Sequence, residues 1–266
     1  MPTIRKPGAH ELIQPKWRNR RTRKVRYAAE HRGAIVTGVN TTSEQVTSLE
    51  ADMKNWKPAP DDRPRVVETD FRDSFASFDK VVSIGVLEHA GRDQLDAVIR
   101  AHAEFLKPGG LGVLHFIGHV GPRETEFFIR HYVFPGGWIP ALSDVIQSME
   151  RWGLEVIDIE NLRRHYALTL DEWLRRFDHA WPELQAQDRS RFDERFRRIW
   201  RTYLLACAEM FRSSKGQTHL YQITFSKGNL PSDATPGAHP GTYPMGRGFL
   251  YPSISTLRNS NARAHP

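Results

Sequence analysis

Cysteine and long apolar runs are both scarce in this chain of 266 residues, and each scarcity excludes a class of protein. The single cysteine, Cys207, cannot build a disulfide framework or a metal site made of several cysteines, and it fits a reducing compartment. No stretch approaches the roughly 20 continuous apolar residues of a membrane span, and no apolar run follows the basic amino terminus as in a secretory signal. We therefore expect a cytoplasmic protein without a transmembrane segment and without a metal.

Positive charge is abundant overall, but it is confined to the two ends. The net charge is +7, of which residues 1–26 contribute +8 and residues 229–266 contribute +2, so the body between them carries −3. An acidic body argues against a nucleic-acid-binding domain, and we expect no nucleic-acid partner. We interpret the basic ends as solvated tails; the alternative is a basic arm that binds phosphates.

Hydrophobic periodicity is missing at the same two ends and present between them. Residues 1–22 show no regular period and contain three prolines, which predicts an unstructured basic segment, while residues 229–266 are rich in Gly, Pro, Ser and Asn, which predicts a disordered tail. Residues 23–228 alternate short apolar runs with amphipathic stretches, which predicts an α/β domain with a parallel sheet covered by helices. Strands are expected at residues 34–39, 65–69, 80–84, 112–117, 155–159 and 219–225, and helices at 23–31, 43–55, 93–105, 139–152, 169–180 and 189–213.

The ends of the expected strands carry the most distinctive residues. Ligands of open α/β sheets bind at the carboxyl ends of the strands. Those ends read GVNTTSEQ, TDFRD, SIGVLEHAG and LHFIGH, followed by YVFPGGWIP, HYALTLDEW and FRRIWRTYLLACAEMFR. In this order, from about Arg23 to Gly228, the set resembles the catalytic domain of cyclopropane-fatty-acyl-phospholipid synthases and mycolic acid cyclopropane synthases.

This resemblance implies a fold, a reaction and a location. The fold is a Rossmann-like class I methyltransferase sheet with inserted helices, and the donor is S-adenosylmethionine. The donor's methyl group goes to the double bond of an unsaturated phospholipid acyl chain, and a bound bicarbonate removes a proton as the cyclopropane ring closes. The resemblance also implies work at the inner membrane surface and, as one possibility, a homodimer.

Four residues match the family's bicarbonate site: Glu88, His115, Ile117 through its backbone, and Tyr166. A His and a Tyr hydroxyl can donate hydrogen bonds to an anion, and a carboxylate can accept one from its protonated oxygen. Each has another interpretation: Glu88 could open a helix, His115 could be a core histidine and Tyr166 could be a packing aromatic. Their joint position at strand ends favours the functional interpretation.

Five residues match the donor site: Asn40, Thr41, Gln45, Asp70 and Phe71. Polar groups after the first expected strand would meet the donor's ribose and backbone, and Asp70 with Phe71 would lie on the adenine side. The alternative for residues 70–73 is an ordinary polar turn. Likewise, the aromatic residues of the last helices could line an acyl tunnel or form core, and the arginines of residues 191–201 could face lipid headgroups or solvent.

One family feature is absent from the sequence. Family members carry a first strand followed by a loop of the form GCGWGG, whereas the matching stretch here, Trp17–Lys24, contains no glycine. That strand is normally central, so its loss should leave two strand edges unpaired. We expect an incomplete domain, with a frameshift, a truncation or a degenerate paralogue left open, and an interrupted coding sequence upstream of Met1.

The sequence leaves three functions open. The leading one is lipid methylene or methyl transfer as in cyclopropane fatty acid synthesis, although the chain as given could be inactive. The alternatives are a methyltransferase of the same fold acting on another lipophilic acceptor, and a non-catalytic remnant.

Overall fold

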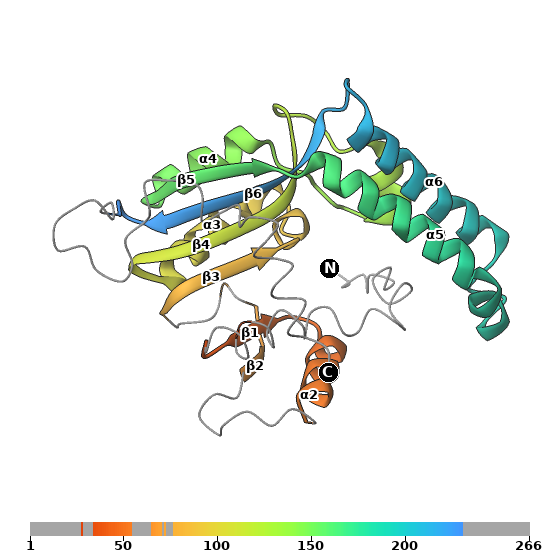
Figure 1. The fold of residues 1–266 in the computed structure, drawn as a ribbon, viewed down its shortest axis with the longest axis horizontal. Helices are drawn as coiled ribbons and strands as arrows, with labels where there is room; N and C mark the ends of the chain where they lie inside the picture. The colour runs from red at the N-terminus through yellow and green to blue at the C-terminus, as the bar shows by residue number, and fades with distance from the viewer. Residues whose placement is uncertain (1–27, 29–33, 55–64, 71, 73–76, 231–266) are drawn as a thin grey trace, which may run out of the picture.

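The computed structural model describes residues 28, 34–54, 65–70, 72 and 77–230, without the side chains of residues 45, 49 and 52–54 (Figure 1). The expected helix at 23–31, the segment 1–22 and the tail from 231 onward therefore lie outside the described residues. The strands are β1 (Thr37–Asn40), β2 (Arg65–Glu68), β3 (Phe78–Ile84), β4 (Leu106–His119), β5 (Leu154–Asn161) and β6 (Thr218–Lys227). The helices are α2 (Ser43–Lys54), η3 (Leu87–His89), η4 (Arg92–Gln94), α3 (Leu95–Phe105), η5 (Ile129–Val133), α4 (Leu142–Arg151), α5 (Arg163–Gln187) and α6 (Glu194–Arg212).

The strands form two sheets. β1 and β2 pair in parallel, and the larger sheet has the order β3-β4-β6-β5. β3 is parallel to β4, but β6 is antiparallel to both β4 and β5. The expected all-parallel sheet is thus corrected to a mixed one, because an apolar run such as that of β6 encodes burial and not strand direction.

The edges of β1 and β3 are among the open strand edges within the described residues. β1 has β2 on one side only, and β3 has β4 on one side only. Parallel strands are usually buried on both faces, yet Val82 on β3 is 66% exposed. Within the described residues, no strand lies between these two edges.

Two apolar clusters hold the larger sheet and its helices together. The first joins the sheet to α3 and α4 and includes Phe116 and Met149, both fully buried. On β4, Gly112 leaves room for the Phe225 ring of the neighbouring strand β6, which a Cβ atom at this position would meet at 2.2 Å. The second cluster lies between α5, α6 and η5, with Phe177, Trp181, Phe192, Trp200, Tyr203 and Phe211 among its buried members. Most of the expected tunnel aromatics therefore form core.

The helix boundaries differ from expectation at two places. α3 ends at Phe105, as Pro108 predicts, but residues 106–110 continue as the start of β4 and not as a free turn. α5 begins at Arg163 and not at residue 169; just before it, the Asn161 Oδ1 atom accepts the Arg163 N–H at 3.1 Å. Tyr166 consequently lies inside the helix.

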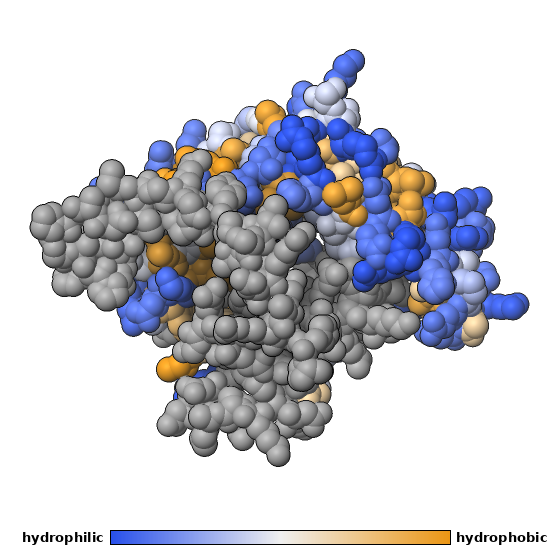
Figure 2. All heavy atoms as spheres, viewed as in Figure 1, coloured by the Kyte–Doolittle hydropathy of each residue, from blue (hydrophilic) through white to orange (hydrophobic). Residues whose placement is uncertain are grey.

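α5 and α6 form a long antiparallel hairpin that extends beside the sheet (Figure 1). Some of its arginines form ion pairs, such as Arg201 with Asp178 between the two helices and Arg212 with Asp171. Figure 2 shows mainly hydrophilic surface along this hairpin, interrupted by apolar patches. These pairs favour the ordinary solvated interpretation of the arginine-rich helix.

Candidate functional site

Glu88 is the centre of the candidate catalytic site. It lies in η3, directly after β3, and its Oε1 atom accepts the backbone N–H of Ile117 at 2.7 Å. Its Oε2 atom is buried and has no hydrogen-bond partner among the described residues. Burial raises the pKa of the Glu88 carboxyl, and the Ile117 N–H acts in the opposite direction. A buried carboxylate oxygen without a donor is costly, so this oxygen is suited to receive a ligand's proton.

β4 carries both His115 and the Ile117 N–H that holds this carboxylate. His115 and Ile117 are two residues apart on β4, so their side chains lie on the same face of the sheet. The carbonyl of His115 accepts the Gly85 N–H at 2.9 Å, and His115 pairs in register with Ile84. The turn that carries Glu88 is therefore fixed at both ends to the segment from His115 to Ile117.

Tyr166 approaches the same point from α5. Its ring packs edge-to-face against Phe211 at 4.9 Å and against Trp173 at 5.9 Å between ring centroids. Burial raises the pKa of the Tyr166 hydroxyl, and the nearby charge of Glu88 raises it further. Tyr166 is thus both a packing aromatic and a protonated hydroxyl close to Glu88.

Two neighbours of Tyr166 were not expected as part of this site. Burial raises the pKa of Tyr203 well above its usual value, with further contributions from Tyr166 and Cys207, and it raises the pKa of Cys207 to about 12. Tyr203, Cys207 and Phe211 are four residues apart on α6 and share one face of it. That spacing was visible in the sequence, but it predicts only a buried face.

The candidate donor residues lie at the ends of β1 and β2. Asn40 ends β1, its carbonyl accepts the Thr69 N–H at 3.1 Å, and its Oδ1 accepts the Thr42 N–H at 3.0 Å in a turn that leads into α2. Because the two strands are parallel, Asn40 and Asp70 lie at the same edge of the small sheet. Thr41 is exposed there. The Gln45 side chain and Phe71 lie outside the described residues.

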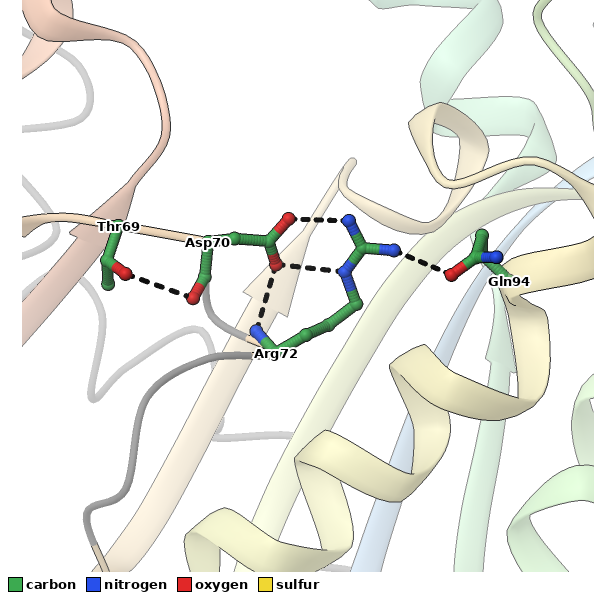
Figure 3. A network of polar contacts seen from close by, with 4 residues as sticks. All are labelled: Thr69, Asp70, Arg72 and Gln94. Carbon is green, nitrogen blue, oxygen red and sulfur yellow. Dashed lines mark hydrogen bonds and ion pairs between the residues drawn. The ribbon is translucent and has the colours of Figure 1, made fainter.

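The Asp70 carboxylate is already paired with a side chain of the same protein, Arg72 (Figure 3). Its Oδ1 accepts both the Arg72 backbone N–H and the Arg72 Nε at 2.9 Å, and its Oδ2 pairs with Arg72 Nη2 at 2.5 Å. Arg72 Nη1 also donates to Gln94 Oε1 at 2.8 Å. The hydrogen bonds from the Arg72 side chain are the main cause that lowers the pKa of Asp70. Arg72 and Gln94 were missed, although the D-x-R spacing within TDFRD was available.

The described part of the chain holds no group of three or more His, Cys, Asp or Glu side chains that could bind a metal ion. Within the same residues, no helix is both long enough and apolar enough to cross a membrane. The site therefore consists of a buried carboxylate, a histidine and a tyrosine at the end of β3 and β4, and a polar edge at the end of β1 and β2.

Comparison with known proteins places this geometry in a family. Residues 22–223 match the family model described as mycolic acid cyclopropane synthetase. The chain belongs to this family. It is 32% identical over 207 residues to the cyclopropane-fatty-acyl-phospholipid synthase of Escherichia coli strain K12, covering 76% of this chain and 50% of the synthase. It is 35% identical over 207 residues to a probable fatty acid methyltransferase of Pseudomonas putida, covering 75% and 50% of the two chains.

Solved structures of cyclopropane synthases share the fold. MmaA2 from Mycobacterium tuberculosis superposes with a TM-score of 0.68 at 25% identity, covering 76% of this chain and 73% of that one. The mycolic acid cyclopropane synthase CmaA1, complexed with SAH and CTAB, gives a TM-score of 0.67 at 26% identity with the same coverage. The chain spans about half the length of the two curated relatives named above, so its own activity and substrates are argued below as proposals.

Proposed function

We propose that this protein transfers the methyl group of S-adenosylmethionine to the double bond of an unsaturated phospholipid acyl chain. The observation that carries the proposal is the Glu88 carboxylate, buried beside Tyr166, with one oxygen held by Ile117 and the other without a partner among the described residues. Family membership and the SAH-bound structure of CmaA1 support the choice of donor.

The chemistry requires a buried negative charge. The donor's C–S bond breaks, a C–C bond forms at the alkene, and S-adenosylhomocysteine leaves, so a positive charge is left on the acyl chain. Ring closure then needs the loss of one proton from the new methyl group. A fixed carboxylate in surroundings that exclude water stabilises such a cation better than water does. The aromatic residues that pack around Tyr166 provide those surroundings.

The residues present fit a bicarbonate ion, but the role of Ile117 differs from the one expected from the sequence. When bound, bicarbonate would supply the general base for proton removal. The free Oε2 of Glu88 would accept its hydroxyl proton, while His115 and the Tyr166 hydroxyl would donate to its oxygens. The N–H of Ile117 already donates to Glu88, so Ile117 would orient the carboxylate and leave the anion to the other residues.

The donor would lie along the edge formed by Asn40, Thr41, Gln45, Asp70 and Phe71. Asp70 would act together with Arg72, because the guanidinium holds both carboxylate oxygens. The catalytic domain would extend over residues 23–228. Its setting would be cytoplasmic and peripheral to the inner membrane surface, with a homodimer as a further proposal.

Product analysis tests the function directly. The chain is incubated with methyl-labelled S-adenosylmethionine, over a concentration series, and with phosphatidylglycerol carrying unsaturated chains dispersed in detergent. We expect label in an acyl chain that has gained one carbon atom, as a cyclopropane ring or a methyl branch. Label on a nitrogen atom would replace this proposal with another lipophilic acceptor, and bound donor without any labelled product would indicate a non-catalytic remnant.

Substitutions at the site sharpen this test. His115→Ala and Tyr166→Phe should each lower turnover by about 10²-fold or more, the usual scale of acid–base groups, and leave donor affinity almost unchanged. Tyr166→Phe keeps the ring that packs on Phe211 and removes only the hydroxyl. His219→Ala, a histidine on β6 bonded to Asn161, serves as the control. Near-normal turnover in His115→Ala would remove His115 from the site.

A further inference from the structure

Residues 126–133, between β4 and α4, place aromatic rings at the surface. Phe127 is 65% exposed, Tyr132 is 40% exposed, and His131 is exposed as well. The Phe127 ring stacks on His131 with centroids 5.0 Å apart and meets Tyr132 edge-to-face at 6.4 Å. We call Phe127, His131 and Tyr132 the aromatic patch. Adjoining exposed rings of this kind mark an interaction surface more often than isolated apolar residues do.

The backbone of this segment gathers the rings on one side. η5 is a π-helical turn, closed by a hydrogen bond of 2.8 Å from the Phe134 N–H to the carbonyl of Ile129. The wider turn brings residues four and five positions apart next to each other, so His131 and Tyr132 both contact Phe127. π-helical turns are rare and are frequently found at functional sites.

The aromatic patch is connected to the candidate catalytic site through apolar side chains. Tyr132 packs at 5.3 Å against Phe128, which belongs with Ile117 and Tyr166 to the edge of the second apolar cluster. Further along the same segment, Phe134 contacts both Tyr203 at 5.9 Å and His89, the neighbour of Glu88, at 6.2 Å. The rings at the surface and the rings beside Glu88 therefore pack against the same apolar cluster.

Charge around the patch favours an anionic partner. Three exposed arginines, Arg92, Arg123 and Arg130, stand against Glu124 and Glu126, and the single Glu124 carboxylate lies 3.2 Å from Arg92 and 3.7 Å from Arg130. The neighbouring segment 163–215 contains twelve Arg and Lys against eight Asp and Glu, a net charge of +4 within an otherwise acidic body. The loop that follows this segment is joined to the loop before the patch by a hydrogen bond of 2.8 Å from the Val120 N–H to the Gln217 carbonyl.

We propose that the aromatic patch is the contact with which this protein inserts into an anionic lipid bilayer, at the entrance through which an acyl chain reaches Glu88. The proposal rests on the lipid acceptor proposed above. Phe and Tyr rings are favoured at the boundary between headgroups and acyl chains, and arginines beside them are attracted to anionic headgroups.

Vesicle co-sedimentation of the full 266-residue chain tests the contact without requiring catalysis. Vesicles of phosphatidylcholine alone are compared with vesicles that contain one third phosphatidylglycerol, for the wild type and for Phe127→Ala/Tyr132→Ala. We expect tighter binding to the anionic vesicles and at least a tenfold loss of partitioning in the double variant on both compositions. The basic residues 1–26 are the same in both proteins, so their attraction to the vesicles cancels in the comparison.

A matched control separates insertion from general surface hydrophobicity. Val82 on β3 has the same exposed fraction as Phe127, 66% against 65%, and Val82→Ser should leave vesicle binding unchanged. Equal binding by the wild type and the double variant would overturn the proposal. So would a change in the double variant that is confined to self-association, measured by light scattering, since the patch would then be a contact between two copies.

The detergent assay described above distinguishes a failure of the proposed membrane contact from a failure of the proposed function. If the wild type methylates dispersed lipid but does not bind vesicles, the contact is wrong and the function stands. If the patch mediates vesicle binding and no acyl product forms, the contact stands and the function fails.

Discussion

Glu88 shows how one residue can be recognised from sequence while its geometry cannot. The motif VLEHAG at the end of a predicted strand was enough to select Glu88 as a candidate. Its hydrogen bond to Ile117 joins residues 29 positions apart, and its choice of rotamer depends on the packing of η3 against β4. The same limit applies to Asp70, whose pairing with Arg72 is a local side-chain choice among several that TDFRD allows.

The pH dependence of stability tests the burial of Glu88. Its pKa in the folded protein is raised above the ordinary value of 4.5, so folding favours the protonated form. The stability that protonation confers is fully present below the unfolded pKa and is lost as pH rises through the folded pKa. Glu88→Gln keeps an acceptor for the Ile117 N–H and removes the charge. The variant should therefore gain free energy of unfolding over the wild type as pH rises above about 4.5.

Urea denaturation of both proteins between pH 4 and pH 8 measures this difference. Glu155→Gln provides the control, because Glu155 is also a carboxylate that accepts hydrogen bonds, from Ser226 and Leu230, yet lies on β5. If the difference in free energy of unfolding between Glu88→Gln and the wild type does not change with pH, burial does not raise the pKa of the Glu88 carboxyl.

Secondary-structure elements were predictable where hydrophobic periodicity is strong. All six strands and the helices α2 to α6 were expected near their observed places, because each buries an apolar face that the sequence displays. The antiparallel direction of β6 and the π-helical turn η5 were not, since neither alters the apolar pattern. Both depend on how the elements pack together.

Arg72 connects two parts of the chain, the end of β2 and η4, that no strand pairing joins. Its guanidinium links Asp70, after β2, to Gln94 in η4, which follows β3 (Figure 3). Arg72→Ala should speed amide hydrogen exchange in β1 and β2 while β4 and β6 stay protected. The loss of global stability should be below about 1 kcal/mol, because the pair is partly exposed to solvent.

Acid should weaken this effect in a defined direction. The pKa of Asp70 is lowered from 3.8, so its pairing with Arg72 stabilises the fold above that value, and the contribution is lost as pH falls through the lower folded pKa.

Hydrogen exchange followed by mass spectrometry at neutral pH measures the effect of Arg72→Ala on β1 and β2. Arg175→Ala, which removes an exposed ion pair with Glu172 on α5, is the control and should leave β1 and β2 unchanged. Equal exchange in both variants would contradict the role given to Arg72.

For the whole molecule, the two open edges of β1 and β3 matter most. They separate the proposed donor residues, at the end of β1 and β2, from the proposed catalytic residues, at the end of β3 and β4. In Rossmann-like sheets the donor usually meets a glycine-rich loop and a helix amino terminus between these two groups. The described residues contain no such loop after a strand, and the sequence before Gly33 contains no Gly-x-Gly.

The affinity of the full chain for S-adenosylmethionine tests this consequence. Asn40, Thr41 and Asp70 can contact the ribose and adenine, but no described residue replaces the backbone donors that meet the charged methionine end. Each lost hydrogen bond to a charged group costs roughly 1.5 to 3 kcal/mol, and every 1.4 kcal/mol weakens binding about tenfold. Isothermal titration of the 266-residue chain should therefore show binding that is orders of magnitude weaker than micromolar. S-adenosylhomocysteine should bind as weakly, because both ligands carry the same charged amino and carboxylate groups at this end. A micromolar dissociation constant for either would mean that residues outside the described ranges hold that end, and the domain would then be functionally complete.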